Sequence, residues 1–243
     1  MARNRPERVK QRFISMVRDE LGPDYDVETH FTPTYNPWDQ RVCLVPDSDM
    51  FKAIKAGRAD VVTDHIDTFT ETGIRLTSGR ELEADIVVSA TGLVLKVMNG
   101  IEVVVDGAPV DPGKTLSYKG MMYEGVPNLA SAFGYTNASW TLKCDLTCEY
   151  VCRLMNHMDL LGMRQATPRN TDPDVGQAPW LDFTSGYVQR AMDKFPKQGT
   201  RAPWKLHQNY ALDLMTLRFA PLEDGVLEFS NPARDQSEAR KAA

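Results

Sequence analysis

The sequence contains no glycine-rich nucleotide-binding loop. It has 16 glycines in 243 residues, and no two of them are separated by a single residue. The chain therefore lacks a GxGxxG dinucleotide fingerprint, and it has no GxxxxGK[ST] phosphate loop either. It also has no GxSxG, HExxH or CxxC motif, so no signature of a serine hydrolase, a zinc protease or a thiol redox site is present.

Long hydrophobic runs and an excess of one charge are also missing. No run of 18 apolar residues occurs, which excludes an obvious transmembrane helix. A formal net charge of −5 gives no electrostatic footprint for nucleic acid. The basic residues near the start surround Glu7 and lack the apolar core of a signal peptide, so a solvated helix is predicted there.

Cysteine is scarce, with Cys43, Cys144, Cys148 and Cys152 as the only four. The last three recur every four residues, which places them on one face of a helix. A structural zinc needs four ligands, usually with CxxC-like spacing, so we predict no metal site and expect small cysteines buried in a packed helix. Nothing demands an oxidising compartment, and a cytoplasmic protein is expected.

Apolar periodicity and turn residues predict several helices. The expected helices are 6–21, ended by Gly22-Pro23, then 49–57, a long one at 138–161 ended by Gly162, and 187–192. Residues 30–41 contain three prolines or turn formers without a period, which predicts a loop; a connector or a functional loop both fit.

Strands are predicted between these helices. Residues 59–65 (continuing into 66–69), 74–77, and 101–105 before the Asp106-Gly107 turn have strand composition, and 116–123 is a strand or a loop. Two apolar runs that close on glycine, 85–92 and 126–134, are typical of strands buried on both faces, as in parallel sheets. The polar tail 230–243 is predicted to be disordered.

Two strand–glycine edges are candidate ligand sites, Ala90-Thr-Gly92 and Gly134-Tyr-Thr-Asn-Ala-Ser139. Ligands of open α/β sheets bind beyond the carboxyl ends of strands, where a helix N-terminus presents N–H groups. Thr136, Asn137 or Ser139 would equally serve as an ordinary N-cap. The residues by themselves indicate an α/β protein with strand-end loops.

The order of motifs resembles the C-terminal half of class B flavoprotein monooxygenases of the Baeyer–Villiger type. The matching segments are Tyr35-Asn-Pro-Trp-Asp-Gln-Arg41, Thr70-Glu-Thr-Gly-Ile74, Asp85 to Gly92, and Pro127-Asn-Leu129 to Gly134. Residues 119–122, 134–142 and 196–204 are most similar to the ethionamide-activating FAD-containing monooxygenase family, which S-oxygenates thioamides and converts ketones to esters. The resemblance runs from about Asp24 to Phe229.

This resemblance implies an α/β fold with two dinucleotide-binding, Rossmann-like domains, here incomplete because the N-terminal FAD-binding segment is missing. Residues 1–85 would be the remainder of the NADPH-binding domain. Residues 86–229 would be the returning part of the FAD-binding domain with an irregular C-terminal segment, followed by the tail at 230–243. The glycine loops for both cofactors are expected upstream of Met1.

The resemblance also assigns roles to individual residues. Arg41 would be catalytic, stabilising the oxygen-bearing flavin and contacting the nicotinamide with a permanently charged guanidinium. The cofactor-binding residues would be Trp38, Asp39, Thr91, Gly92, Gly134, Thr136, Asn137 and Ser139. Trp204 and Asn209 would contact the substrate or the nicotinamide. Tyr135 departs from related disulfide reductases, which carry an aspartate there, and this weakens the expectation of a ribityl contact.

The implied function is a monooxygenase that uses FAD and NADPH on a small ketone, sulfide or thioamide. The chain by itself is expected to bind FAD poorly and to have no useful turnover. An apolar patch would remain for an N-terminal half supplied in trans or for a second copy of the chain. The alternative is a non-catalytic remnant that persists as an interaction module.

Overall fold

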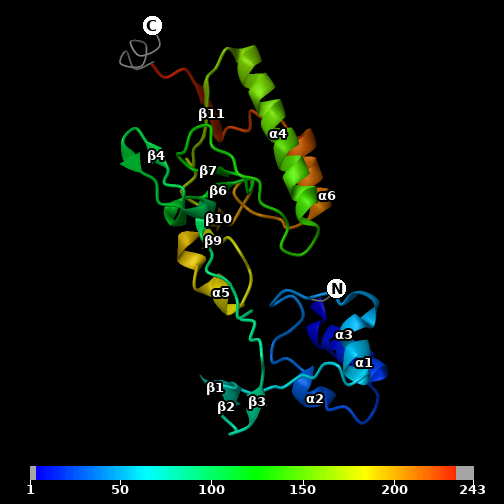
Figure 1. The fold of residues 1–243 in the computed structure, drawn as a ribbon. Coiled ribbons are helices and arrows are strands. Elements are labelled where there is room, and N and C mark those ends of the chain that lie inside the picture. Colours follow the sequence, from blue (N-terminus) through cyan, green and yellow to red (C-terminus); the bar gives the residue numbers. More distant parts are fainter. Residues whose placement is uncertain (1–3, 234–243) are drawn as a thin grey trace. The chain divides into compact units, whose positions relative to one another are not determined.

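The structure, a computed structural model, describes residues 4–233 and divides into two compact units (Figure 1). Unit 1 comprises the described residues up to Leu93 together with Phe183–Ser185, and unit 2 comprises Val94–Asp182 and the residues from Gly186 onward. The sequence placed a boundary at 85/86. Most of the predicted disordered tail, from residue 234, lies outside the described residues.

Unit 1 contains the helices α1 (Pro6–Leu21), α2 (Val27–His30) and α3 (Asp49–Lys55), blue to cyan in Figure 1. Two of these three helices follow the sequence prediction, and the short α2 was not predicted. Pro6 lies in the first helical turn, where its missing N–H is not needed. Gly22 ends α1 with a φ of +89°, and its N–H donates to the Arg18 carbonyl at 2.9 Å. The predicted helices 6–21 and 49–57 are confirmed.

Unit 1 also contains a three-stranded antiparallel sheet. Its strands are β1 (Ile66–Phe69), β2 (Gly73–Leu76) and β3 (Glu81–Glu83), in that order. A side chain at Gly73 would place its Cβ 1.9 Å from the Leu82 carbonyl oxygen, so glycine is required for this pairing. Hydrogen bonds from Ser78, the His65 N–H and Thr77 lower the pKa of Asp64 to about 2.

Two predicted strands of unit 1 are absent. Residues 59–65 are irregular up to the start of β1. Residues 85–92 are also irregular, and their apolar side chains are exposed: Ile86 is 82% and Val88 is 81% exposed. A strand needs a neighbour for its N–H and C=O groups, and none of the residues that the structure describes pairs with this segment. The prediction that 85–92 forms a strand buried on both faces is therefore wrong for this structure. The parallel pairing expected with it is also not seen, because every named strand pair is antiparallel.

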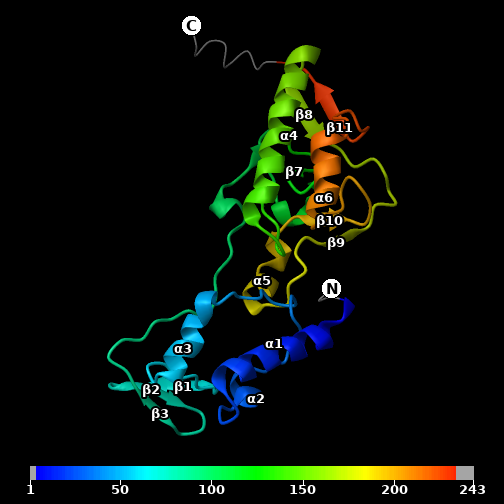
Figure 2. The same ribbon diagram turned by 90° about the vertical axis from the view of Figure 1, so that its right-hand side faces the viewer.

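Unit 2 contains a long helix, short hairpins and irregular segments (Figure 2). Its strands are β4 (Val104–Val105), β5 (Ala108–Pro109), β6 (Ser117–Tyr118), β7 (Met122–Tyr123), β8 (Gln165–Pro168), β9 (Gln177–Pro179), β10 (Lys197–Gly199) and β11 (Leu227–Ser230). Its helices are α4 (Trp140–Leu161), α5 (Gly186–Gln189) and α6 (Tyr210–Asp213), the last continuing into a π-helical turn, Leu214–Phe219. β4 pairs with β5, β6 with β7, β8 with β11 and β9 with β10.

The turn chemistry of unit 2 agrees with the sequence. Asp106 and Gly107 both have positive φ between β4 and β5, as a two-residue hairpin requires. Gly162 ends α4 in the left-handed conformation with a φ of +66°. The long helix and the hairpin turn are confirmed, and 116–123 forms the β6–β7 hairpin.

The core of unit 2 lies between α4, the π-helical turn, the β6–β7 hairpin and the β8–β11 pair. Its fully buried side chains include Tyr118, Leu146, Tyr150, Trp204 and Leu217. The other apolar run that closes on glycine, 126–134, does not form the predicted strand. It contains a turn and a single β-bridge, from Ala130 to Met122. Its burial alternates along the chain, so it is not buried on both faces.

The cysteines of α4 are also placed differently from the prediction. The helix buries the face that carries Lys143, Leu146, Thr147, Tyr150 and Leu154. Cys148 and Cys152 lie on another face and are exposed, and Cys144 is half-buried, so the prediction of buried cysteines is wrong. No group of three or more His, Cys, Asp or Glu residues within 4–233 is arranged to hold a metal ion.

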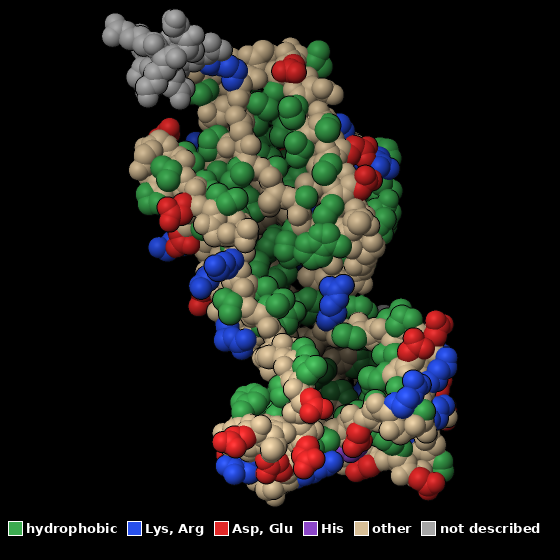
Figure 3. All heavy atoms as spheres, viewed as in Figure 1, with side chains coloured by type: hydrophobic (Ala, Val, Ile, Leu, Met, Phe, Trp, Pro, Cys, Tyr) green, Lys and Arg blue, Asp and Glu red, His purple; other side chains and the backbone are tan. Residues whose placement is uncertain are grey.

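Hydrophobic side chains also reach the surface of unit 2. Figure 3 shows them between charged groups on the face that it presents. On α4 and the π-helical turn, Met155 is 61%, Leu160 86% and Phe219 63% exposed. Among the described residues, no helix is both long enough and apolar enough to cross a membrane.

Candidate functional site

The predicted site at Gly134 is a tightly packed turn that leads into α4. A Cβ at Gly134 would lie 2.3 Å from the Trp140 ring, so no side chain larger than hydrogen fits. The Phe133 ring packs against the rings of both Trp140 and Trp180, with 4.5 Å between ring centroids in each pair. Aromatic packing therefore fixes the backbone at this turn.

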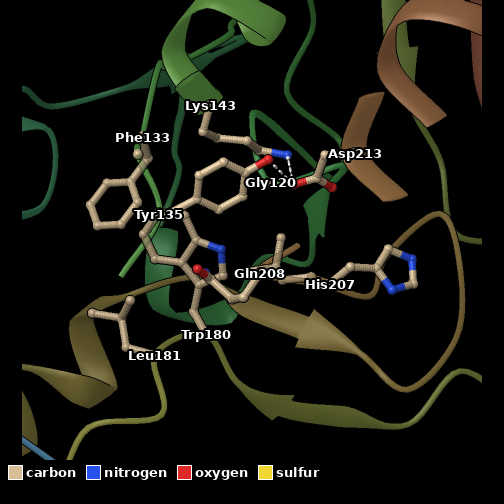
Figure 4. A pocket seen from close by; sticks show the side chains of 11 residues that line it. Gly120, Phe133, Tyr135, Lys143, Trp180, Leu181, His207, Gln208 and Asp213 are labelled. Atoms are coloured by element: carbon tan, nitrogen blue, oxygen red, sulfur yellow. Dashed lines mark hydrogen bonds and ion pairs between the residues drawn. The ribbon is translucent and has the colours of Figure 1, made fainter. Parts of the chain in front are cut away.

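Tyr135 anchors the same turn to a buried ion pair. Its hydroxyl donates to Asp213 Oδ2 at 2.7 Å, and Lys143 Nζ lies 3.0 Å from the same oxygen (Figure 4). The Lys143 and Asp213 side chains are only 8% and 7% exposed. Burial lowers the pKa of Lys143, and the charge of Asp213 partly opposes that shift. Burial, followed by the hydrogen bond to Asp213, raises the pKa of Tyr135.

Thr136 and Asn137 are held by one residue, Gln208. The Thr136 N–H donates to Gln208 Oε1 at 3.0 Å, and the Thr136 hydroxyl donates to the same atom at 3.2 Å. Asn137 Nδ2 donates to the Gln208 carbonyl at 3.2 Å. Gln208 has a left-handed backbone with a φ of +48°, which an L-residue adopts only when its surroundings hold it there. The side chains predicted to contact a ligand are thus bonded within the protein.

Ser139 occupies the N-cap position of α4 but does not cap the helix with its side chain. Its hydroxyl bonds instead to that of Thr141 at 2.9 Å. Side-chain capping by Thr136, Asn137 or Ser139, the alternative raised by the sequence, is therefore wrong.

A small pocket lies beside this turn (Figure 4). It is lined by two glycines, aromatic side chains and the buried ion pair: Gly120, Phe133, Gly134, Tyr135, Lys143, Trp180, Leu181, Leu206, His207, Gln208 and Asp213. Trp180 is 5% exposed, and its indole N–H has no hydrogen-bond partner among the described residues. The pocket therefore contains an unsatisfied buried donor, which is uncommon in folded proteins.

Trp204 and Asn209 lie in the segment that leads to α6. Trp204 is 1% exposed and packs edge-on against Tyr118 at 5.8 Å, while Gly199 leaves room for it because a Cβ there would lie 2.4 Å from the Trp204 Cβ. This is the environment of a core residue. The Asn209 side chain caps α6 by accepting the Leu212 N–H at 3.1 Å, directly after Gln208.

A second buried charge cluster lies elsewhere in unit 2. Lys119 Nζ is 3.1 Å from Asp224 Oδ2, to which the Tyr118 hydroxyl donates at 2.6 Å, and Tyr150 joins at 3.0 Å from Tyr118. Although burial opposes it, the hydrogen bond from Tyr118 and the Lys119 charge hold the pKa of Asp224 below its usual value. Burial raises the pKa of Tyr150 to about 12.

The remaining predicted residues belong to unit 1. Asp39 accepts the Asn36 N–H at 3.1 Å, and Trp38 has a φ of +73°, which shapes a tight turn before Arg41. The Arg41 guanidinium is exposed and has no ion pair with any residue that the structure describes. It borders an apolar depression with Phe13, Tyr35 and Val42 among its walls.

Thr91 and Gly92 follow the unpaired segment of unit 1 and are exposed, with a φ of +114° at Gly92. The structure thus brings together Gly134, Thr136 and Asn137 in unit 2 and keeps Trp38, Asp39 and Arg41 on one loop in unit 1. Sequence reasoning missed Lys143, Trp180, Gln208 and Asp213. Only Lys143 could have been found from the sequence, because it is a lysine at a position on the apolar face of a predicted helix.

The chain is similar in sequence to FAD-containing monooxygenases. No family model matches the chain. Over 225 residues, or 93% of the chain, it is 51% identical to the FAD-containing monooxygenase EthA of Mycobacterium tuberculosis and covers 46% of that protein. It is 46% identical to the probable FAD-binding monooxygenase AlmA of Acinetobacter baylyi, with 94% of the chain and 46% of the relative covered.

A third relative is the putative FAD-containing monooxygenase MymA of Mycobacterium tuberculosis, 46% identical over 96% of the chain and 47% of the relative. The chain therefore spans about half the length of the curated relatives that it matches. It is a half-length homologue of these FAD monooxygenases, which confirms the resemblance found in the sequence.

Proposed function

We propose that the chain is the C-terminal half of an FAD- and NADPH-dependent monooxygenase that converts ketones to esters or S-oxygenates thioamides and sulfides. One observation carries this proposal: identity of 46–51% to three FAD monooxygenases extends along 93–96% of the chain. Similarity at that level over a whole chain is hard to reconcile with a shared fold alone, because many functions share one fold.

The segment 85–93 is the proposed connection to the half of the relatives that the chain does not match. Its backbone forms no hydrogen bond within the part of the chain that the structure describes, and Ile86, Val88 and Leu93 are 82%, 81% and 64% exposed. A β-branched run with unpaired N–H and C=O groups is suited to β-strand addition, in which main-chain bonds supply affinity. We propose that it completes a Rossmann-like sheet whose other strands come from the complementary half.

The turn at Gly134 is the proposed contact with FAD. The buried Trp180 N–H lines the same pocket as Gly134 and has no partner among the described residues, so the pocket offers a donor to a carbonyl oxygen of the flavin ring. When bound, FAD would supply the redox and oxygen chemistry, and the protein supplies position and charge. In unit 1, Arg41 would provide a fixed positive charge, and Trp38, Asp39, Thr91 and Gly92 would complete the proposed cofactor contacts. Ser139 at the start of α4 and Asn209 at the start of α6 are both exposed, and they would add polar contacts.

The test is complementation. The chain is co-expressed with the part of EthA that it does not match, and the purified complex is assayed for flavin absorbance and for NADPH oxidation with a ketone and a thioamide. A yellow, NADPH-oxidising complex is expected, and the chain alone should show neither property. Arg41→Lys keeps the charge but loses the forked donor, so it should reduce turnover without reducing flavin content.

Assembly is tested separately. Ile86→Asp with Val88→Asp should abolish co-purification, because two charges would enter the proposed sheet. Leu160→Asp alters an equally exposed residue on α4 and should leave co-purification intact. Equal co-purification of both variants would contradict strand addition at 85–93.

The competing outcome is a non-catalytic module. It predicts that the chain forms a stable homo-oligomer through the same exposed segment and accepts no complementary half. Light scattering on the purified chain, with and without the complementary half, separates the two cases.

A further inference from the structure

The polar side chains at the Gly134 turn differ in whether they are free to meet a ligand. The Thr136 N–H and hydroxyl and the Asn137 amide donate to Gln208, and the Tyr135 hydroxyl donates to Asp213. The resemblance assigns Thr136 and Asn137 as cofactor contacts, yet both are bonded within the protein. These bonds occupy both Thr136 donors and the Tyr135 hydroxyl, so another donor that lines the pocket is better placed to meet a ligand.

Trp180 Nε1 is a buried donor in this pocket that has no partner among the described residues. The indole is buried between Phe133 and Phe195, with ring centroids at 4.5 and 5.6 Å, and so its position is fixed by packing. A buried N–H without a partner costs roughly 1–3 kcal/mol. That cost disappears when an acceptor enters the pocket.

The pocket restricts what that acceptor can be. Its volume is about 20 Å³, which is room for a single oxygen-sized group. Asp213 Oδ2 already accepts from Lys143 and Tyr135, while the Lys143 ammonium has donors to spare, so the polar groups favour an acceptor over a cation. Aromatic rings and the two glycines, Gly120 and Gly134, form much of the wall.

We propose that Trp180 is a ligand-binding residue. Its indole N–H donates a hydrogen bond to a carbonyl oxygen of a planar ring that binds against the Gly134 turn. This assignment rests on the proposed function, in which that ring is the isoalloxazine of FAD. The contact comes from a residue in the segment before α5, far in sequence from the strand-end glycine.

The test uses the complex of the full chain with the complementary part of EthA. Tryptophan is labelled with ¹⁵N in the indole ring, and the Trp180 signal is assigned as the one absent in Trp180→Phe. Addition of FAD should move this signal downfield. Trp180→Phe should bind FAD roughly five- to tenfold more weakly, as expected for one lost hydrogen bond. Phe195→Leu disturbs packing on the Trp180 ring but keeps the donor, so its Trp180 signal should still move.

The outcomes separate the two proposals. One outcome is that flavin absorbance shows that the complex has bound FAD while the Trp180 signal does not move. In that case FAD does not contact the Trp180 N–H, so the assignment to Trp180 is overturned and the proposed function stands. Affinity within twofold of wild type in Trp180→Phe would likewise overturn it. If the complex takes up no FAD, both proposals fail.

Discussion

Asp213→Asn tests the buried cluster that anchors the Gly134 turn. The substitution keeps the shape of the side chain and an acceptor for Tyr135, but it removes the charge that faces Lys143 at 3.0 Å. Both side chains are more than nine-tenths buried. Breaking a buried pair by removing one partner typically costs about 3–5 kcal/mol, because the remaining charge is uncompensated. We expect about 3 kcal/mol, since the Tyr135 hydrogen bond survives.

The cost should depend on pH through Lys143. Burial already lowers the pKa of Lys143 from 10.5, and the loss of Asp213 removes the group that opposed this shift. Between the lowered folded pKa and 10.5 the unfolded chain binds more protons, so stability rises with pH in that window. The deficit of the variant should therefore be largest at neutral pH and shrink as pH approaches 10.5.

Urea unfolding followed by tryptophan fluorescence measures this directly, because Trp140, Trp180 and Trp204 all lie in unit 2. With a slope of about 1–3 kcal/mol/M, a loss of about 3 kcal/mol lowers the midpoint by about 1–3 M. An apolar replacement of the whole cluster by Lys143→Met, Asp213→Leu and Tyr135→Phe should cost less than Asp213→Asn alone. A loss under about 1 kcal/mol at pH 7, or one that does not shrink as pH rises, would refute the reasoning.

Three further measurements follow from the same physical arguments. Gly134→Ala forces a Cβ to 2.3 Å from the Trp140 ring and should destabilise unit 2 by about 1–3 kcal/mol, visible as a lower thermal midpoint; an unchanged midpoint would show that the ring moves aside freely. Tyr118→Phe removes a donor from the half-buried Asp224 and should cost about 1–3 kcal/mol by urea unfolding, and a neutral result would mean that water replaces the hydroxyl. The carboxyl of Asp64 should titrate by NMR near pH 2, since its hydrogen bonds favour the charged form, and a midpoint at 3.8 would show that they do not form in solution.

Local sequence signals determined the regular helices and turns. The apolar period and the glycines at their ends placed α1 and α4, and the Asp106-Gly107 pair placed the β4–β5 turn. These features depend on residues within a few positions of one another, so the chain encodes them locally. The ordered motifs also carried the resemblance to FAD monooxygenases, because motif order is a property of the sequence itself.

Tertiary structure decided which of these residues meet. Asp213 lies 78 positions from Tyr135, and Gln208 lies 72 positions from Thr136. Nothing local marks these residues as partners, since contacts at such a separation depend on packing of the whole unit. The run 85–92 shows the converse: its composition is that of a buried strand, but burial requires neighbours, and none of the described residues supplies one. Composition sets what a segment is able to bury, whereas only the assembled chain decides whether anything covers it.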